Sequence, residues 1–161
     1  MNTIRLLEQR LGPEEQLILE SLLEKYAIFD GLAPGWVGKL VPAFQIKEFR
    51  DEEIVCHCPD ASHDAFVLLK GTVAVTRKKG EAIHVLQLEG LGPVFNIGPL
   101  IGLEKDPAGV RALGSVELLG IDSIMLNRVM HLEWEIGFKL LRNLCRLVMI
   151  QNGRILDRYI E

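Results

Sequence analysis

Apolar residues recur at helical spacing near both ends of the chain and in short, turn-bounded runs between them. Within residues 2–26, Leu6, Leu7 and Leu11 share a helical face, later leucines continue the apolar pattern, and the Gly12-Pro13 pair divides the segment into two helices. A further short helix is predicted over residues 34–41. We therefore expect residues 1–43 to form N-terminal helices.

The middle segment, residues 44–121, has a different pattern. Its apolar stretches are short and follow one another without helices, which predicts a jelly roll, sandwich or barrel. The predicted strands are QIKEF, EIVCHC, AFVLLK, TVAVTR, AIHVLQL, GVRAL and VELLGI. They are separated at Lys70-Gly71, Lys79-Gly80-Glu81, Gly90 and Gly114-Ser115. AFVLLK is apolar on both faces, so we expect it to be central.

Residues 122–161 are predicted to be helical again. Asp122 or Ser123 is expected to cap a short helix that runs to about Met130, and a long helix follows. Apolar residues on the long helix recur every seven positions, and Asn152-Gly153 is expected to weaken its end. This stripe can pack on the chain's own roll, which is expected to cover part of it, or against a second copy of the chain. The helix is long for one roll to cover, so we expect a homodimer contact through Trp134, Leu141, Leu144, Val148 and Ile155.

Composition narrows the class of protein. A chain of 161 residues that is 48% hydrophobic and 25% charged fits one globular domain. The formal net charge is −4 and no Lys/Arg-rich tract occurs, so direct binding of nucleic acid is not expected. The sequence contains no signal peptide and no run that could span a bilayer, which predicts a cytoplasmic protein without membrane contact.

Cysteine and histidine give weak support to metal or redox chemistry. Three cysteines argue against a disulfide framework, and Cys56-His57-Cys58 has no second cysteine pair to complete a zinc site. The histidines form no His-x-His pair, which disfavours a cupin-type metal enzyme. No nucleophile motif occurs. We expect a non-enzymatic protein without a cofactor, and a haem or redox sensor using Cys56, Cys58 or His84 is the less favoured interpretation.

Several segments, taken in order, resemble one known family. They are IFDGLAPGWVGKLVPAF, FRDEEIVCHCPDASHDAFVLLKGTVAV, LEGLGPVF and VRALGSVELLGIDSIMLNRVM. This series is similar to the cyclic-nucleotide-binding domain, the effector domain of catabolite activator-like proteins. The resemblance covers the chain from about Tyr26 onward. It implies a mostly β fold, a jelly-roll β-barrel with N-terminal helices and a long C-terminal helix, as a single domain over residues 1–161.

The phosphate-binding loop departs from the family pattern. The family has Phe-Gly-Glu, in which the Glu binds the ribose hydroxyl, and then Arg-Ser/Thr-Ala, in which the Arg pairs with the cyclic phosphate. Here the first motif corresponds to Phe95-Asn96-Ile97 and the arginine position to Asp106. Arg111 is expected to be a surface or rim arginine. The predicted pocket residues are Gly92, Phe95, Asn96, Ile97, Gly98, Pro99, Leu100, Asp106 and Arg111.

These departures predict a regulatory or sensory module that does not bind cyclic AMP or cyclic GMP in the usual way. The alternative is a working cyclic-nucleotide sensor with a remodelled loop, which signals through the C-terminal helix. A third interpretation is a structural interaction domain without a ligand. No helix of DNA-recognition type follows the long helix. If the chain is complete, it does not read DNA itself, and a separate regulatory protein is a candidate partner.

Overall fold

The computed structural model describes residues 26–56, 64–103 and 108–160. In chain order its elements are η1 (Ala27–Phe29), α3 (Pro34–Leu40), η2 (Val41–Ala43), β1 (Phe44–Phe49), β2 (Ile54–Cys56), β3 (Asp64–Lys79), β4 (Ala82–Glu89), β5 (Val94–Phe95), η3 (Gly98–Ile101), β6 (Gly109–Asp122), α4 (Ser123–Leu132) and α5 (Trp134–Ile160). The helix predicted over 34–41 is confirmed as α3. The helices predicted within 2–25 lie outside the described residues.

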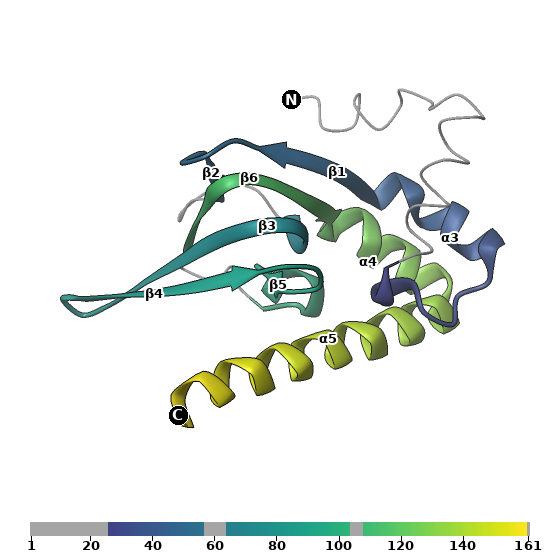
Figure 1. The fold of residues 1–161 in the computed structure, drawn as a ribbon. Coiled ribbons are helices and arrows are strands. Elements are labelled where there is room, and N and C mark those ends of the chain that lie inside the picture. Colours follow the sequence, from purple (N-terminus) through teal and green to yellow (C-terminus); the bar gives the residue numbers. More distant parts are fainter. Residues whose placement is uncertain (1–25, 57–63, 104–107, 161) are drawn as a thin grey trace.

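The strands form an antiparallel sheet in the order β1-β6-β3-β4, with β2 paired to β6 and β5 paired to β3. The prediction of a mostly β roll with flanking helices is confirmed. One part of it is corrected: the described strands form an open sheet and not a closed barrel. Figure 1 shows α3 and α4 at one end of the sheet and α5 running beneath it.

Two predicted turns are bends within continuous strands. AFVLLK and TVAVTR belong to the single strand β3, and GVRAL and VELLGI belong to β6. The pairing of β3 with β6 is irregular between Leu68 and Thr72, where Gly71 has φ 95°. A Cβ atom at Gly71 would lie 2.4 Å from the carbonyl oxygen of Ser115. The glycine therefore lets the two long strands approach closely where they bend.

Alternate residues of β3 divide between two apolar clusters, which explains its apolar character on both faces. Ala65 and Val67 pack in the cluster shared with the helices, whereas Phe66 and Leu68 pack in a second cluster inside the roll. Because β3 pairs with β6, β4 and β5, its predicted central position is confirmed.

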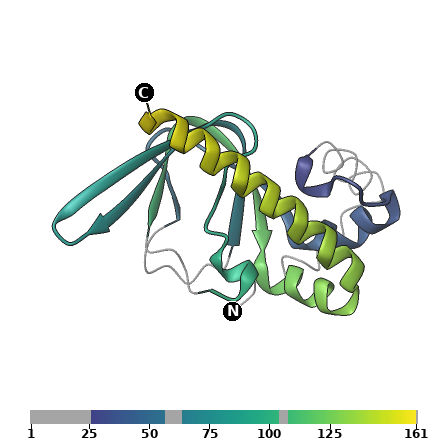
Figure 2. The ribbon, with the colours of Figure 1, turned by 90° about the horizontal axis from the view of Figure 1, so that it is seen from below.

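The C-terminal helices begin as predicted. The Asp122 carboxylate accepts a hydrogen bond from the backbone N–H of Met125 at 2.9 Å and caps α4. Helix α5 continues through Asn152-Gly153 to Ile160 as one helix (Figure 2). Its buried Asn143 donates hydrogen bonds to the carbonyl oxygens of Ile28 at 2.9 Å and Asp30 at 2.8 Å, which attach η1 to the helix. No helix in the described part of the chain is long and apolar enough to cross a membrane.

Candidate functional site

A cavity of about 660 Å³ lies between the roll and α5. Its walls come from the β3–β4 hairpin, the loop from β5 into η3, the segments flanking residues 104–107, and α5. The lining is mostly apolar, and the residues are Val75, Arg77, His84, Val85, Leu86, Leu88, Val94, Phe95, Asn96, Ile97, Gly98, Ile101, Leu103, Ala108, Val148, Gln151, Ile155 and Tyr159. A volume of this size is typical of small-molecule sites.

The loop after β5 has a defined backbone. Phe95 is buried and stacks on Phe66, with 5.2 Å between ring centroids. Asn96 has φ 52°, and its amide nitrogen donates to the carbonyl oxygen of Asp64 at 2.7 Å. Asparagine tolerates this left-handed conformation better than most residues, so it can occupy a position where the family that the sequence resembles has glycine. Ile97 follows in a right-handed conformation and begins the turn of η3.

The predicted pocket residues divide between several places. Phe95, Asn96, Ile97 and Gly98 line the main cavity, and Gly92 lines a neighbouring cavity of about 120 Å³. Pro99 is not in either lining, and its carbonyl oxygen lies 3.5 Å from the Asn127 amide nitrogen. Leu100 is buried in the core beside the helices. Asp106 lies outside the described residues.

Arg111 lies on β6 and does not line the cavity. Its guanidinium is exposed and pairs with the Glu52 carboxylate at 2.9 Å, across the turn between β1 and β2. Glu52 itself holds φ 66°. The placement of Arg111 agrees with the expected surface arginine and differs from the expected position at the cavity rim.

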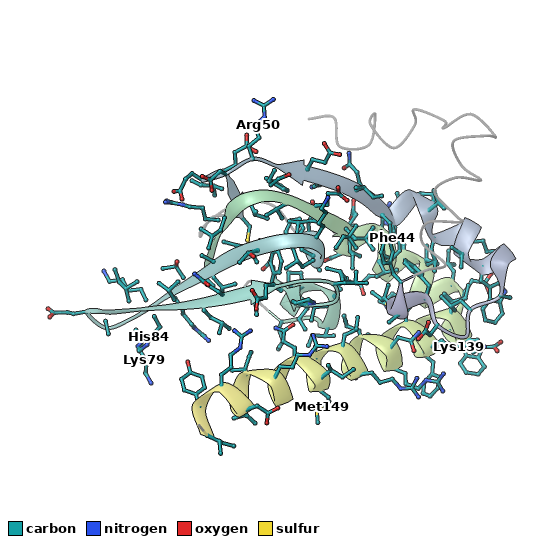
Figure 3. The ribbon with its side chains drawn as sticks, in the orientation of Figure 1. Phe44, Arg50, Lys79, His84, Lys139 and Met149 are labelled. Atoms are coloured by element: carbon teal, nitrogen blue, oxygen red, sulfur yellow. The ribbon has the colours of Figure 1, made fainter. Side chains whose placement is uncertain are left out.

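The sequence prediction missed the contribution of the β3–β4 hairpin. Arg77 and His84 are opposite each other in the register of these strands, and both line the cavity. Figure 3 shows Lys79 and His84 projecting from the hairpin on the side where α5 lies. The predicted turn at Lys79-Gly80-Glu81 could have shown that these two residues are neighbours. When the strands are paired outward from a two-residue loop, Arg77 lies opposite His84.

Helix α5 closes the cavity with Val148, Gln151, Ile155 and Tyr159. The Gln151 amide makes two hydrogen bonds to the Val94 backbone: its oxygen accepts from the N–H at 2.7 Å, and its nitrogen donates to the carbonyl at 3.0 Å. Two of the residues predicted for a dimer contact, Val148 and Ile155, therefore face the chain's own cavity.

The other predicted dimer residues also divide. Leu144 is 5% exposed and belongs to the core, which differs from its predicted place in an interface. Trp134 is 76% exposed and Leu141 is 37% exposed. A strict seven-residue repeat drifts by about 20° per heptad around a straight α-helix. The predicted stripe thus begins on the outer face of α5 at Trp134 and ends against the roll at Ile155.

Metal-binding chemistry finds little support in the described residues. They contain no group of three or more His, Cys, Asp or Glu side chains that could hold a metal ion. Cys56 is buried on β2, as expected for a small apolar residue in a strand. His57, Cys58 and His63 lie outside the described residues, and His131 is near the end of α4.

No protein-family model matches the sequence, and no curated protein matches it. Solved structures do match. The regulatory domain of Toxoplasma gondii PKA, crystallised with cAMP, is 20% identical with a TM-score of 0.61, over 73% of this chain and 46% of that one. A candidate cyclic nucleotide-binding protein from Geobacter metallireducens GS-15 is 18% identical with a TM-score of 0.69, over 81% of this chain and 96% of that one.

The sensor domain of the transcriptional regulator DNR from Pseudomonas aeruginosa is 18% identical with a TM-score of 0.65, over 88% of this chain and 94% of that one. The chain thus spans less than half of the Toxoplasma structure and nearly all of the other two. Its fold is that of the cyclic-nucleotide-binding domains. At these identities the likeness establishes the fold and not the ligand.

Proposed function

We propose that this chain is a non-enzymatic regulatory module whose cavity does not bind cyclic AMP or cyclic GMP in the usual way. The observation that carries the proposal is the position of Ile97, which lines the cavity where the related family has a glutamate. Arg111 adds support, because its guanidinium is engaged by Glu52 away from the cavity.

The chemistry of the lost contacts is unfavourable for a cyclic nucleotide. A hydrocarbon side chain cannot accept the ribose hydroxyl, and a charge-assisted hydrogen bond contributes about 1.5–3 kcal/mol. Loss of the carboxylate and of the loop arginine would each weaken binding by about tenfold to a hundredfold. The cavity also argues against a purely structural interaction domain, since a mostly apolar cavity of about 660 Å³ is typical of ligand sites.

The second candidate is a cyclic-nucleotide sensor with a remodelled site. The position of Arg77 favours this candidate, because Arg77 supplies a guanidinium to the cavity from β3. In this candidate, the phosphate would be held from the β3–β4 hairpin and not from the loop after β5.

Calorimetric titration of the purified chain with cyclic AMP and cyclic GMP tests the proposal. We expect no binding tighter than about 100 μM, given the loss of two charge-assisted contacts. Micromolar binding that is lost in Arg77→Gln and retained in Arg111→Gln would establish the second candidate. Micromolar binding lost in Arg111→Gln would show that the loop rearranges around that arginine.

We further propose that the chain acts as a cytoplasmic homodimer through the outer face of α5. Exposed apolar residues on this face recur at spacings of three, four, seven and eight positions, which keeps them on one side of the helix: Trp134, Phe138, Leu141, Met149, Leu156 and Ile160. Figure 3 shows Met149 on the side of α5 that faces away from the sheet. Gln151 and Val148 of the same helix line the cavity. A change in the cavity could therefore reach the interface, or a separate regulatory protein bound there, through one helix.

A further inference from the structure

The cavity-facing side of the β3–β4 hairpin changes from apolar to cationic along its length. Alternation from the buried Val73 places Val75, Arg77 and Lys79 on this side of β3. On β4, Leu88 lies opposite Val73, Leu86 opposite Val75 and His84 opposite Arg77. The apolar pairs are near the roll, and the cationic side chains are near the turn of the hairpin. We infer that the cavity takes an amphipathic monoanion, an apolar body with one terminal carboxylate.

The apolar part of the lining favours an apolar body. It includes Leu86, Leu88, Phe95, Ile97 and Val148. Two polar groups of this lining are engaged by the protein: Gln151 uses both ends of its amide on Val94, and the Asn96 amide nitrogen donates to the Asp64 carbonyl oxygen. A ligand hydroxyl placed beside these engaged groups would lose its bonds to water without replacement, at a cost of about 1–3 kcal/mol.

Positive charge near the turn of the hairpin favours a carboxylate. Among the described lining residues Arg77 is the sole side chain with a permanent charge, and none of them is an aspartate or glutamate. Neither Arg77 nor Lys79 takes part in an ion pair between described residues. A guanidinium can bind a carboxylate through two parallel hydrogen bonds, and His84 opposite it can donate a further one. This inference rests on the proposed function, because it assigns a ligand to the same cavity.

The test compares octanoate with 1-octanol, which has the same apolar body without the charge, by isothermal titration calorimetry on the full chain. We expect octanoate to bind at least about tenfold more tightly than 1-octanol at neutral pH. Arg77→Gln should remove most of this difference by weakening octanoate binding and leaving 1-octanol binding unchanged. Lys78→Gln is the matched control, because Lys78 is the adjacent residue on the opposite side of β3.

A second variant locates the ligand. Ile155→Trp places a large side chain in the cavity wall and should weaken the binding of both ligands. Equal affinities for octanoate and 1-octanol, an unchanged preference in Arg77→Gln, or failure of both ligands to bind would each overturn the inference. If octanoate shows no preference over 1-octanol and cyclic nucleotides also do not bind, this inference fails and the proposed function is unaffected. Tight binding of a cyclic nucleotide would overturn the proposed function itself.

Discussion

The side-chain amide of Gln151 satisfies both backbone polar groups of Val94, with hydrogen bonds of 2.7 Å and 3.0 Å. Val94 is 3% exposed, so water cannot easily replace either bond. Its strand β5 leads directly into the loop that lines the cavity. A single side chain therefore attaches the long C-terminal helix to the wall of the candidate ligand site.

Replacing Gln151 with methionine should loosen this attachment. Methionine has nearly the same shape but leaves the N–H and the carbonyl of Val94 unpaired, so we expect a loss of about 1–3 kcal/mol in the free energy of unfolding. Urea denaturation measures the loss, and amide hydrogen exchange at Val94 should become faster. Asn152→Ala, at the adjacent exposed position, is the control and should lose no stability. Unchanged exchange at Val94 would show that the helix is held by its apolar contacts alone.

Substitution of Gly71 by alanine should be far more costly than substitution of Gly80. Both glycines have positive φ, 95° and 63°, so both alanines are strained. A Cβ at Gly71 would also lie 2.4 Å from the Ser115 carbonyl oxygen, whereas nothing lies within 4 Å of one at Gly80. We expect about 1 kcal/mol of destabilisation in Gly80→Ala and clearly more in Gly71→Ala. Thermal unfolding of the two variants compares them directly, and equal losses would show that the strands shift apart.

Local patterns in the sequence were sufficient for most of the fold. Alternation and turn residues gave the strands, and the capping carboxylate of Asp122 marked the start of α4. The sequence predicts turns at Gly71 and Gly114 because glycine is typical of turns, but both glycines, each with positive φ, lie at bends within a strand. Only the pairing of β3 with β6 on either side of each bend distinguishes a bend from a turn, and that pairing is a long-range property.

The candidate site was predictable in its loop and not in its other walls. Phe95 to Gly98 were found because the loop resembles a known motif. Arg77 and His84 needed the hairpin register, and Gln151 needed the position of α5 against β5. The seven-residue repeat of α5 was interpreted as one stripe, but the helical drift divides it between the outer face and the cavity.

The outer face of α5 should mediate self-association. Met149 is 70% exposed on this face, and Met149→Glu would place a charge in the proposed apolar contact. We expect the variant to raise the dimer dissociation constant by at least about tenfold, measured by sedimentation equilibrium. The control, Arg154→Glu, also introduces a glutamate at an exposed position of α5, but five residues further along and so about 140° around the helix. A monomeric wild-type chain at all concentrations, or equal effects of both variants, would contradict the proposed interface.

If the loss of two charged side chains explains why the chain does not bind a cyclic nucleotide, restoring both should create affinity for it. Ile97→Glu supplies a carboxylate to the cavity, and the right-handed backbone at this position accepts glutamate without strain. Asp106→Arg supplies the arginine at the position that the family resemblance assigns to the phosphate ligand. Each regained charge-assisted bond contributes about 1.5–3 kcal/mol, so the double variant should bind cyclic AMP at least about a hundredfold more tightly than the wild type.

Titration calorimetry of the double variant and of both single variants measures the gain. The single variants should each gain less, because each restores one contact. A double variant that binds no better than the wild type would show that the shape of the cavity, and not its missing charges, excludes the nucleotide.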